Sequence, residues 1–339
     1  MTTVFSLFDE AAEATAHDDR ETVTALLRRI RETTATDPVL RDFFLAAFAS
    51  RLDPAAREHP RPADVPRFDL ACATTLANDR LLPFLDGRES ATVLALGIGS
   101  GRQECDLLER APELRSLTVV GVDTGDRLAQ AETAVRATAA RMGIEVVFHA
   151  VPSAPERLGE DVWRLVAQAP RPLLVTASFA LHRMRDDGQG DPRSGLFHRL
   201  RDLAPAAFAL CEPHSDHHHV PLRARFAHAW RYYGALFAAI DSTRAAEAGK
   251  IALKQFLGRE IQDVVGTRDE DRIERHEPAE AWAHRFTAAG FRLLPPSRTA
   301  GATPGVLRTR TLPDRVELSF QDTPLVAVLV GIPDWSHAR

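Results

Sequence analysis

The chain has 339 residues, with 42 basic and 47 acidic side chains and a formal net charge of −5, and 45% of its residues are hydrophobic. This is a normal globular mixture, sufficient for one large core with appendages or for two smaller cores. No stretch is strongly basic over many residues, which argues against a partner nucleic acid bound through a positive face. The longest apolar runs, such as 118–122 and 325–330, are too short to cross a membrane.

The cysteines are odd in number and widely spaced, at Cys72, Cys105 and Cys211. This pattern predicts neither a disulfide framework nor a zinc ribbon. The N-terminal segment lacks the basic region followed by an apolar core that a secretory signal requires. The sequence therefore predicts a protein of the reducing cytoplasm.

The first 66 residues are predicted to form an N-terminal helical cap. Val23, Leu26 and Ile30 recur at helical spacing, while the proline-rich stretch 53–66 indicates a connector. Farther along, a long helix over 220–245 and a second helix from Pro278 to Gly290 predict a helical insert around 220–290. The remainder, 67–339, is predicted to be one α/β domain.

Strands and helices alternate between residues 91 and 213. The apolar strands are ATVLAL, LTVVGVD, IEVVFHAV, PLLVTASFAL and AAFALCEP. Such alternation favours a parallel sheet with helices on both faces and a ligand crevice at the carboxyl ends of the strands. Two further strands are expected at the C-terminus, around a turn at Gln321–Thr323. The fold class is therefore α/β, of the Rossmann-like kind.

The motif GIGSG follows the first strand and opens a helix. Its spacing differs from the GxGxxG of dinucleotide folds and is typical of Rossmann-like methyltransferases, which bind S-adenosylmethionine. Asp123, at the end of the second strand, is placed to accept the ribose hydroxyls, although it could instead cap the helix 127–142. The residues expected to hold the cofactor are those of this loop and of the neighbouring strand ends: Gly97, Ile98, Gly99, Gly101, Gln103, Asp123, Thr124, Ser153 and Ser178.

Polar side chains at the ends of the fourth and fifth strands suggest an acceptor site. His182 and Glu212 are the candidate catalytic bases, although His182 could equally be a structural histidine. The run His214–His219 invites a metal, but successive loop residues point apart, so no metal is predicted. The expected substrate contacts, several of which fit a helix core equally well, are His214, His217, Arg225, Trp230, Tyr232 and Tyr233.

Several segments together resemble the GRAS domain family, and specifically its bacterial branch. The similar segments are FDLACATTLANDRLLPFL, LALGIGSGRQ, SFALHRM, EPHSDHH, RFAHAWRYYGALFAAID and EIQDVVGTRDEDRIERHEPAEAWAHRFTAAGFRLLP. The resemblance runs from Phe68 to Trp335. It implies a Rossmann-like methyltransferase fold with a helical cap, and it implies that Asn78 reaches the amino-acid end of the cofactor.

The resemblance also implies two kinds of function. Plant members are mostly transcriptional regulators that have lost or repurposed the cofactor site, whereas bacterial members are thought to be small-molecule methyltransferases. Because the glycines and Asp123 are kept, we expect an S-adenosylmethionine-dependent enzyme that methylates a small molecule, in secondary metabolism for example, and releases S-adenosylhomocysteine.

The alternative is a regulatory or scaffold protein of the GRAS type that binds the cofactor or a small molecule without turnover. A nicotinamide oxidoreductase is disfavoured by the GxGxG spacing. The identity of the acceptor and the formation of a homodimer stay open.

Overall fold

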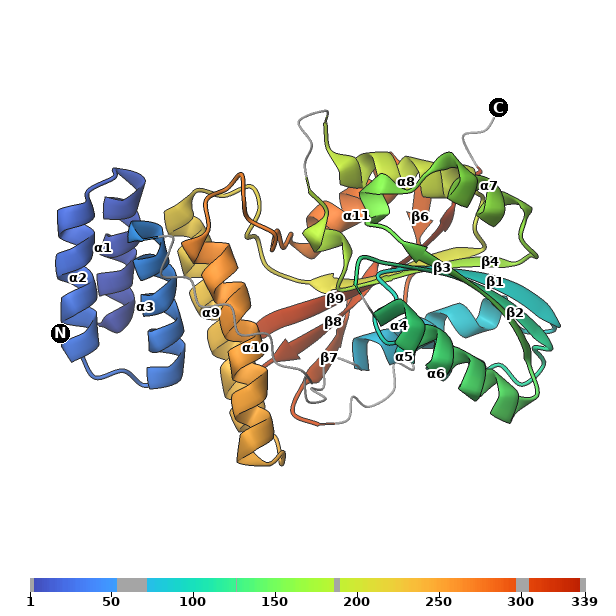
Figure 1. Ribbon diagram of the computed structural model, residues 1–339, viewed down its shortest axis with the longest axis horizontal. Helices are drawn as coiled ribbons and strands as arrows, with labels where there is room; N and C mark the ends of the chain where they lie inside the picture. The colour runs from blue at the N-terminus through green and yellow to red at the C-terminus, as the bar shows by residue number, and fades with distance from the viewer. Residues whose placement is uncertain (1–2, 54–71, 126, 186–189, 297–304, 336–339) are drawn as a thin grey trace.

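The computed structural model describes residues 3–53, 72–125, 127–185, 190–296 and 305–335. Figure 1 shows a helical lobe at one end of the molecule and a sheet covered by helices at the other. The predicted connector 53–66 lies outside the described residues except for Asp53, and so does the predicted boundary between 66 and 67.

The helical lobe combines the predicted cap with the predicted insert. Three helices come from the N-terminus, and each begins after a side chain that accepts a hydrogen bond from a first-turn backbone N–H, at Thr3, Asp19 and Asp37. The lobe consists of α1 (Val4–Ala16), α2 (Arg20–Glu32), α3 (Pro38–Leu52), α9 (Leu222–Asp241) and α10 (Glu247–Gly266). At Gly258 of α10 a Cβ would lie 2.1 Å from the ring of Phe43, so the missing side chain lets α10 pack closely on α3.

The sheet confirms the predicted α/β fold. Its parallel strands are β1 (Ser90–Leu96), β2 (Ser116–Asp123), β3 (Glu145–Pro152), β4 (Leu173–Ser178) and β5 (Ala207–Pro213). The antiparallel part contains β6 (Phe291–Leu293), β7 (Arg308–Thr311), β8 (Arg315–Phe320) and β9 (Thr323–Pro333). The order is β3-β2-β1-β4-β5-β9-β8-β7, with β6 paired to β9. The two predicted C-terminal strands are β8 and β9, whereas β6 and β7 were not predicted.

Helices cover both faces of the sheet (Figure 1). One hydrophobic core joins the sheet to α4 (Cys72–Leu81), α5 (Arg102–Glu109) and α6 (Arg127–Met142). The other joins it to α7 (Glu160–Gln168), α8 (Pro192–Asp202) and α11 (Ala279–Ala288). Short 3₁₀ turns follow α4, β3 and β4, as η3 (Leu82–Phe84), η4 (Pro155–Arg157) and η5 (Leu181–Arg183). Among the described residues, no helix is long and apolar enough to cross a membrane.

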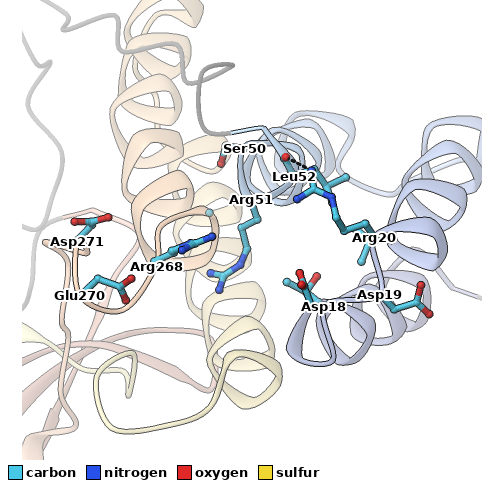
Figure 2. A pocket seen from close by; sticks show the side chains of 12 residues that line it. Asp18, Asp19, Arg20, Ser50, Arg51, Leu52, Arg268, Glu270 and Asp271 are labelled. Atoms are coloured by element: carbon cyan, nitrogen blue, oxygen red, sulfur yellow. Dashed lines mark hydrogen bonds between the residues drawn. The ribbon is translucent and has the colours of Figure 1, made fainter.

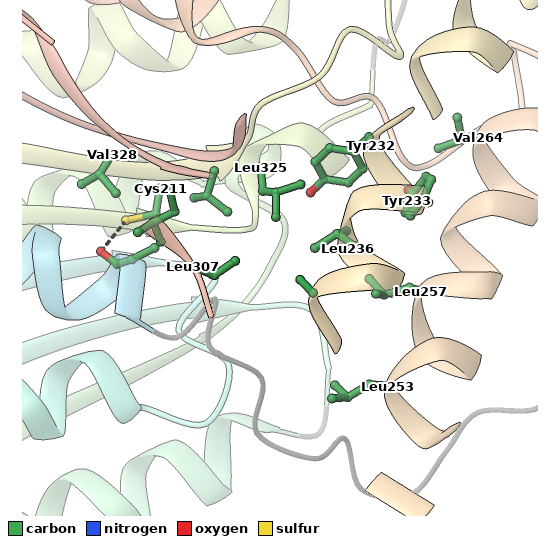
Figure 3. Packing of buried hydrophobic residues seen from close by; sticks show 14 of the residues in the cluster. Cys211, Tyr232, Tyr233, Leu236, Leu253, Leu257, Val264, Leu307, Leu325 and Val328 are labelled. Atoms are coloured by element: carbon green, nitrogen blue, oxygen red, sulfur yellow. Dashed lines mark hydrogen bonds between the residues drawn. The ribbon is translucent and has the colours of Figure 1, made fainter. Parts of the chain in front are cut away.

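The helical lobe packs directly on the sheet. Figure 3 shows Leu325 and Val328 of β9 on the side of the sheet that faces Leu236 of α9 and Leu257 of α10, and all four side chains belong to one buried core. The segment between α10 and α11 then runs back over the strand ends, where the His217 N–H donates to the His276 carbonyl at 2.9 Å. The carboxyl edge of β4 and β5 is therefore covered by chain from the helical lobe.

Candidate functional site

The glycine loop after β1 has the backbone that its sequence predicts. Gly97, Gly99 and Gly101 all have positive φ, at 76°, 57° and 75°, which favours glycine at each position. At Gly97, however, a Cβ would lie 2.3 Å from the Cβ of Ala180 in the turn after β4. The close approach that Gly97 permits is therefore used by the protein's own chain.

Of the other loop residues, Ile98 and Gly101 pack against neighbouring elements, whereas Gly99 does not. A Cβ on Gly101 would lie 3.1 Å from a methyl group of Val135 on α6, so this glycine lets the loop pack on a helix. Ile98 is buried and covers Gly121 of β2. Only at Gly99, of the loop's three glycines, would a Cβ meet no described atom within 4 Å. Gly99 thus marks the open part of the loop.

Three of the predicted cofactor ligands bond to one another. The Ser178 hydroxyl donates to the Gln103 side-chain oxygen at 2.7 Å, and the Gln103 amide donates to the Asn78 side-chain oxygen at 3.3 Å. The Asn78 amide in turn donates to the Gln103 carbonyl and to Asp106, both at 2.8 Å. These polar groups therefore form an internal network that links α4, α5 and β4.

Asp123 lies at the end of β2, next to the glycine loop. Its carboxylate accepts the Gly99 N–H at 2.9 Å, the Thr124 N–H at 2.8 Å and the Gly125 N–H at 3.3 Å. The carboxylate therefore holds its own loop together. The neighbouring Thr124 is exposed, and the half-buried Ser153 donates to the carbonyl of the next residue at 3.1 Å.

The two candidate bases form a buried chain of hydrogen bonds. One Glu212 oxygen accepts the backbone N–H groups of Ala180 and Leu181, at 3.1 Å and 2.7 Å. The other lies 2.5 Å from Nδ1 of His182, and Nε2 of His182 lies 2.9 Å from Glu274. Glu274 was not predicted as a site residue, since it follows His182 by about ninety positions in the sequence.

This arrangement bears on the two roles expected for His182, a general base or a structural histidine. Burial alone would lower the pKa of His182, but the carboxylates of Glu212 and Glu274 outweigh burial and raise this pKa to about 9. A ring that is protonated at neutral pH and donates from both nitrogens cannot accept a proton from a substrate. The geometry matches the alternative of a structural histidine.

Three of the predicted substrate contacts surround this chain of hydrogen bonds in the interior. The ring of His217 is fully buried and stacks on Tyr233, with ring centroids 5.9 Å apart, and its Nε2 lies 2.9 Å from the Ser215 hydroxyl. Burial lowers the pKa of His217 well below its usual value. Tyr232 is buried beside it, and the Tyr233 hydroxyl donates to Glu260 at 3.4 Å. None of these three rings is exposed to solvent.

Two more of the predicted substrate contacts make internal polar contacts. Arg225 is buried and forms an ion pair with Asp269 at 2.7 Å. His214 accepts the Ala279 N–H through Nδ1 at 3.0 Å, and its Nε2 lies 3.4 Å from Glu317. Arg225 thus ties α9 to the segment between α10 and α11, and His214 ties the end of β5 to α11 and β8.

Trp230 lies in a different place from the one expected. Its ring packs against Phe8, Phe44 and Phe226, with centroids 5.7, 5.1 and 6.0 Å away. These rings come from α1, α3 and α9, so Trp230 fastens α9 to the N-terminal helices. This position is away from the strand ends, where the substrate contact is expected.

A polar pocket of about 490 Å³ lies apart from the glycine loop, within the helical lobe. It is bordered by the α1–α2 turn, the end of α3 and the chain after α10. Figure 2 shows Arg51 reaching into it, with Arg268 on one side and Asp18 on the other. The Arg51 guanidinium also donates to the carbonyls of Val265 and Thr267, at 2.8 and 2.9 Å. No sequence pattern predicts this pocket.

Comparisons with known proteins agree on one family. The sequence profile of the GRAS domain family matches residues 65–321. Scarecrow-like protein 1 of Arabidopsis thaliana is 28% identical over 65% of this chain and 40% of its own length. DELLA protein 2 of Medicago truncatula is 24% identical over 66% of this chain and 43% of its own length. The chain thus spans less than half of these relatives.

Among solved structures, SCL7 of Oryza sativa has the same fold. It is 19% identical, with a TM-score of 0.77, and the match covers 98% of this chain and all of that one. The likeness supports the Rossmann-like sheet and its helical lobe.

These findings correct the expected function. The DELLA and Scarecrow-like relatives are plant members of the family, for which a regulatory role is expected. This likeness contradicts the expectation that the chain is an enzyme that methylates a small molecule. It also contradicts a small-molecule acceptor as the partner. The same plant relatives give no support to placement in a bacterial branch or to a biosynthetic role. Because the profile match spans most of the chain, the chain belongs to the GRAS domain family.

Proposed function

We propose that the chain is a non-catalytic regulatory protein of the GRAS type that acts by binding other proteins. The observation that carries this proposal is the contact between Gly97 and Ala180, where a Cβ on the glycine would lie 2.3 Å from that of the alanine. The turn after β4 borders the side of a Rossmann-like crevice that would hold the methionine part of the cofactor. With that side closed by Ala180, a reactive methyl group has no place beside an acceptor.

The polar groups around the loop support the same proposal. Ala180 is fixed by its N–H bond to Glu212, so the closure rests on a buried hydrogen-bonded element. His182 is held between two carboxylates, and Asn78 and Gln103 bond to each other. General acid–base catalysis needs a group that can exchange a proton with the substrate. The groups here are arranged to hold the fold.

The proposal that the chain binds other proteins is based on its similarity to plant GRAS proteins. About two thirds of this chain matches DELLA and Scarecrow-like proteins. A rigid sheet with a covered crevice and a helical lobe offers a stable surface for such partners.

Capture of partners tests this proposal. The tagged full chain is expressed in its source cells, cross-linked, purified and compared by quantitative mass spectrometry with the tag alone. We expect the same protein partners in repeated preparations, in amounts comparable to the chain. Recovery of the chain alone, at cross-linker doses that capture a known complex in the same cells, would contradict the proposal.

We also propose that the open part of the loop binds a nucleoside without turnover. Gly99 has open space beside it, Thr124 is exposed, and the Asp123 carboxylate accepts three N–H groups at its two oxygens. Two carboxylate oxygens offer about four acceptor positions, which leaves one for a ribose hydroxyl.

Calorimetric titration with adenosine and with S-adenosylmethionine tests the nucleoside site. Because Ala180 closes the methionine side, we expect the two affinities to agree within about threefold, a difference of less than about 1 kcal/mol. Affinity for S-adenosylmethionine that is more than about tenfold higher would mean that the methionine side is open.

A further inference from the structure

Two histidines and a glutamate converge in the interior, His182 from η5 and Glu274 and His276 from the segment that precedes α11. Nε2 of His182 lies 2.9 Å from Oε2 of Glu274, and Nε2 of His276 lies 3.3 Å from the same oxygen. The three side chains are buried, and their potential ligand atoms all lie within 4.8 Å of one another. The cluster joins η5 to the segment between α10 and α11, which is distant from it in sequence.

We propose that His182, Glu274 and His276 bind a divalent transition-metal ion of the zinc class. Zinc binds imidazole nitrogens and carboxylate oxygens at about 2.0–2.2 Å in a tetrahedral arrangement, which places neighbouring ligand atoms about 3.3 Å apart. The separations of 2.9 and 3.3 Å are close to this spacing. Two imidazoles and one carboxylate are also a ligand set that zinc uses in proteins.

The surroundings of the cluster contain the second layer of contacts that metal sites need. A metal-bound histidine usually donates its other ring N–H to a carboxylate, which fixes the ring and its tautomer. Nδ1 of His182 makes this contact with Glu212 at 2.5 Å, which leaves Nε2 directed at Glu274. Arg183 donates to the other oxygen of Glu274 at 2.9 Å, so the ligating oxygen is oriented too.

The third ligand is available and not fully satisfied. His276 is buried, and its Nε2 lies 3.3 Å from Oε2 of Glu274, so this nitrogen faces the other two ligands. Nδ1 of His276 and Nδ1 of His217 are buried without a hydrogen-bond partner among the described residues. The two rings are 4.8 Å apart. Nε2 of His276, and not Nδ1, faces Glu274, so the unsatisfied Nδ1 atoms call for a partner beside the cluster, such as an ordered water.

Charge also favours a divalent ion at this position. When ionised, Glu212, Glu274 and Glu260 surround the cluster with three negative charges, and Arg183 supplies one positive charge. A divalent cation bound to neutral histidines makes the group neutral, and it replaces the proton that otherwise bridges His182 and Glu274.

Two other groups of histidine and carboxylate side chains lack this advantage. Glu277, beside His218 and His219, accepts both terminal nitrogens of Arg285. Glu317, beside His214, is bound by Arg315 at 2.8 Å. Each of these groups also contains an exposed residue, His219 or Glu280, whereas all three members of the proposed cluster are buried, so the two groups serve as internal controls.

Metal loading of the full chain tests the proposal. Purified chain is stripped with a chelator, incubated with Zn²⁺, freed of excess ion and analysed by elemental mass spectrometry and thermal unfolding. We expect about one Zn²⁺ per chain and a higher Tm with Zn²⁺ than without. Cobalt loading is expected to give the visible absorption of a tetrahedral site. Chain that retains no metal and shows an unchanged Tm would show that a proton alone bridges the cluster.

Variants assign the metal to these residues. His276→Gln removes a ligand while the glutamine amide can still donate to Glu274, and we expect it to lower Zn²⁺ affinity at least about tenfold. His214→Gln, in a control group, is expected to leave affinity and the cobalt spectrum unchanged. Circular dichroism of the metal-free variants checks that both fold. Equal loss in both variants, or no loss in His276→Gln, would overturn the assignment.

Discussion

Ala180 stands directly over Gly97, so that the turn after β4 closes on the glycine loop after β1. A Cβ on Gly97 would lie 2.3 Å from the Cβ of Ala180, a distance that real side chains do not reach. Ala180 in turn donates its N–H to Glu212 on β5. Three neighbouring strand ends are thereby joined at the edge of the sheet where the sequence predicts a cofactor site.

Replacement of Gly97 by alanine should destabilise the fold. The left-handed backbone costs an alanine about 1–2 kcal/mol, and the clash with Ala180 adds about 1–3 kcal/mol of overpacking. Gly99→Ala has a similar backbone, with φ of 57°, but its added Cβ would meet no described atom within 4 Å. Urea denaturation should therefore show a loss of about 2–5 kcal/mol for Gly97→Ala and about 1–2 kcal/mol for Gly99→Ala.

A double variant separates the two causes of this loss. Gly97→Ala combined with Ala180→Gly removes the clash and keeps the backbone cost, so it should recover part of the stability lost in the single Gly97→Ala variant. Additive effects of the two changes would mean that the side chains do not touch.

The contact between α3 and α9 should contribute strongly to stability. Phe44 is fully buried and contacts Trp230 at a centroid distance of 5.1 Å. Phe44→Ala should lower the free energy of unfolding by about 3–5 kcal/mol, because it leaves a large cavity. Val39→Ala, on the same helix but 44% exposed, should change it by less than about 1 kcal/mol. A similar effect of both would contradict the packing described for the helical lobe.

Glu104 should make stability depend on pH. Burial raises the pKa of Glu104 from 4.5 to about 7. Between these values the unfolded chain has released the proton while the folded chain keeps it, so stability falls as pH rises through this window. The full difference corresponds to about 3 kcal/mol. This loss of stability should be complete above about pH 7.

Glu104→Gln checks this expectation. The variant mimics the protonated acid, so its free energy of unfolding relative to the unmodified chain should increase by about 3 kcal/mol from pH 4.5 to pH 8. Glu109→Gln, on the exposed face of the same helix, should show no such change. Parallel pH profiles for Glu104→Gln and the unmodified chain would refute the role of Glu104.

The alternating strands and helices, the glycine loop and the strand-end position of Asp123 could be predicted from local sequence patterns. The contact between Ala180 and Gly97 could not be predicted, because the spacing of GIGSG does not reveal which residue packs against the loop. Glu274 was missed for a related reason. It reaches His182 only through a segment that folds back from the helical lobe, and local periodicity carries no information about such a contact.

The role of α9 illustrates a second limit. Apolar side chains occupy more than one face of this helix, since Trp230 contacts the N-terminal helices while Tyr232 lies beside His217. Helical periodicity identifies apolar faces but does not say which partner each face meets. The sequence therefore does not show which faces of the N-terminal helices and of the insert pack on one another within the lobe (Figure 1).

Release of S-adenosylhomocysteine is the most direct test of the proposed non-catalytic role. The purified full chain is incubated with S-adenosylmethionine and an extract of its source cells, and product is followed by mass spectrometry beside a known methyltransferase as positive control. We predict no product above the chain-free mixture, since Ala180 covers Gly97. Saturable formation of S-adenosylhomocysteine that disappears in Asp123→Ala would contradict the account.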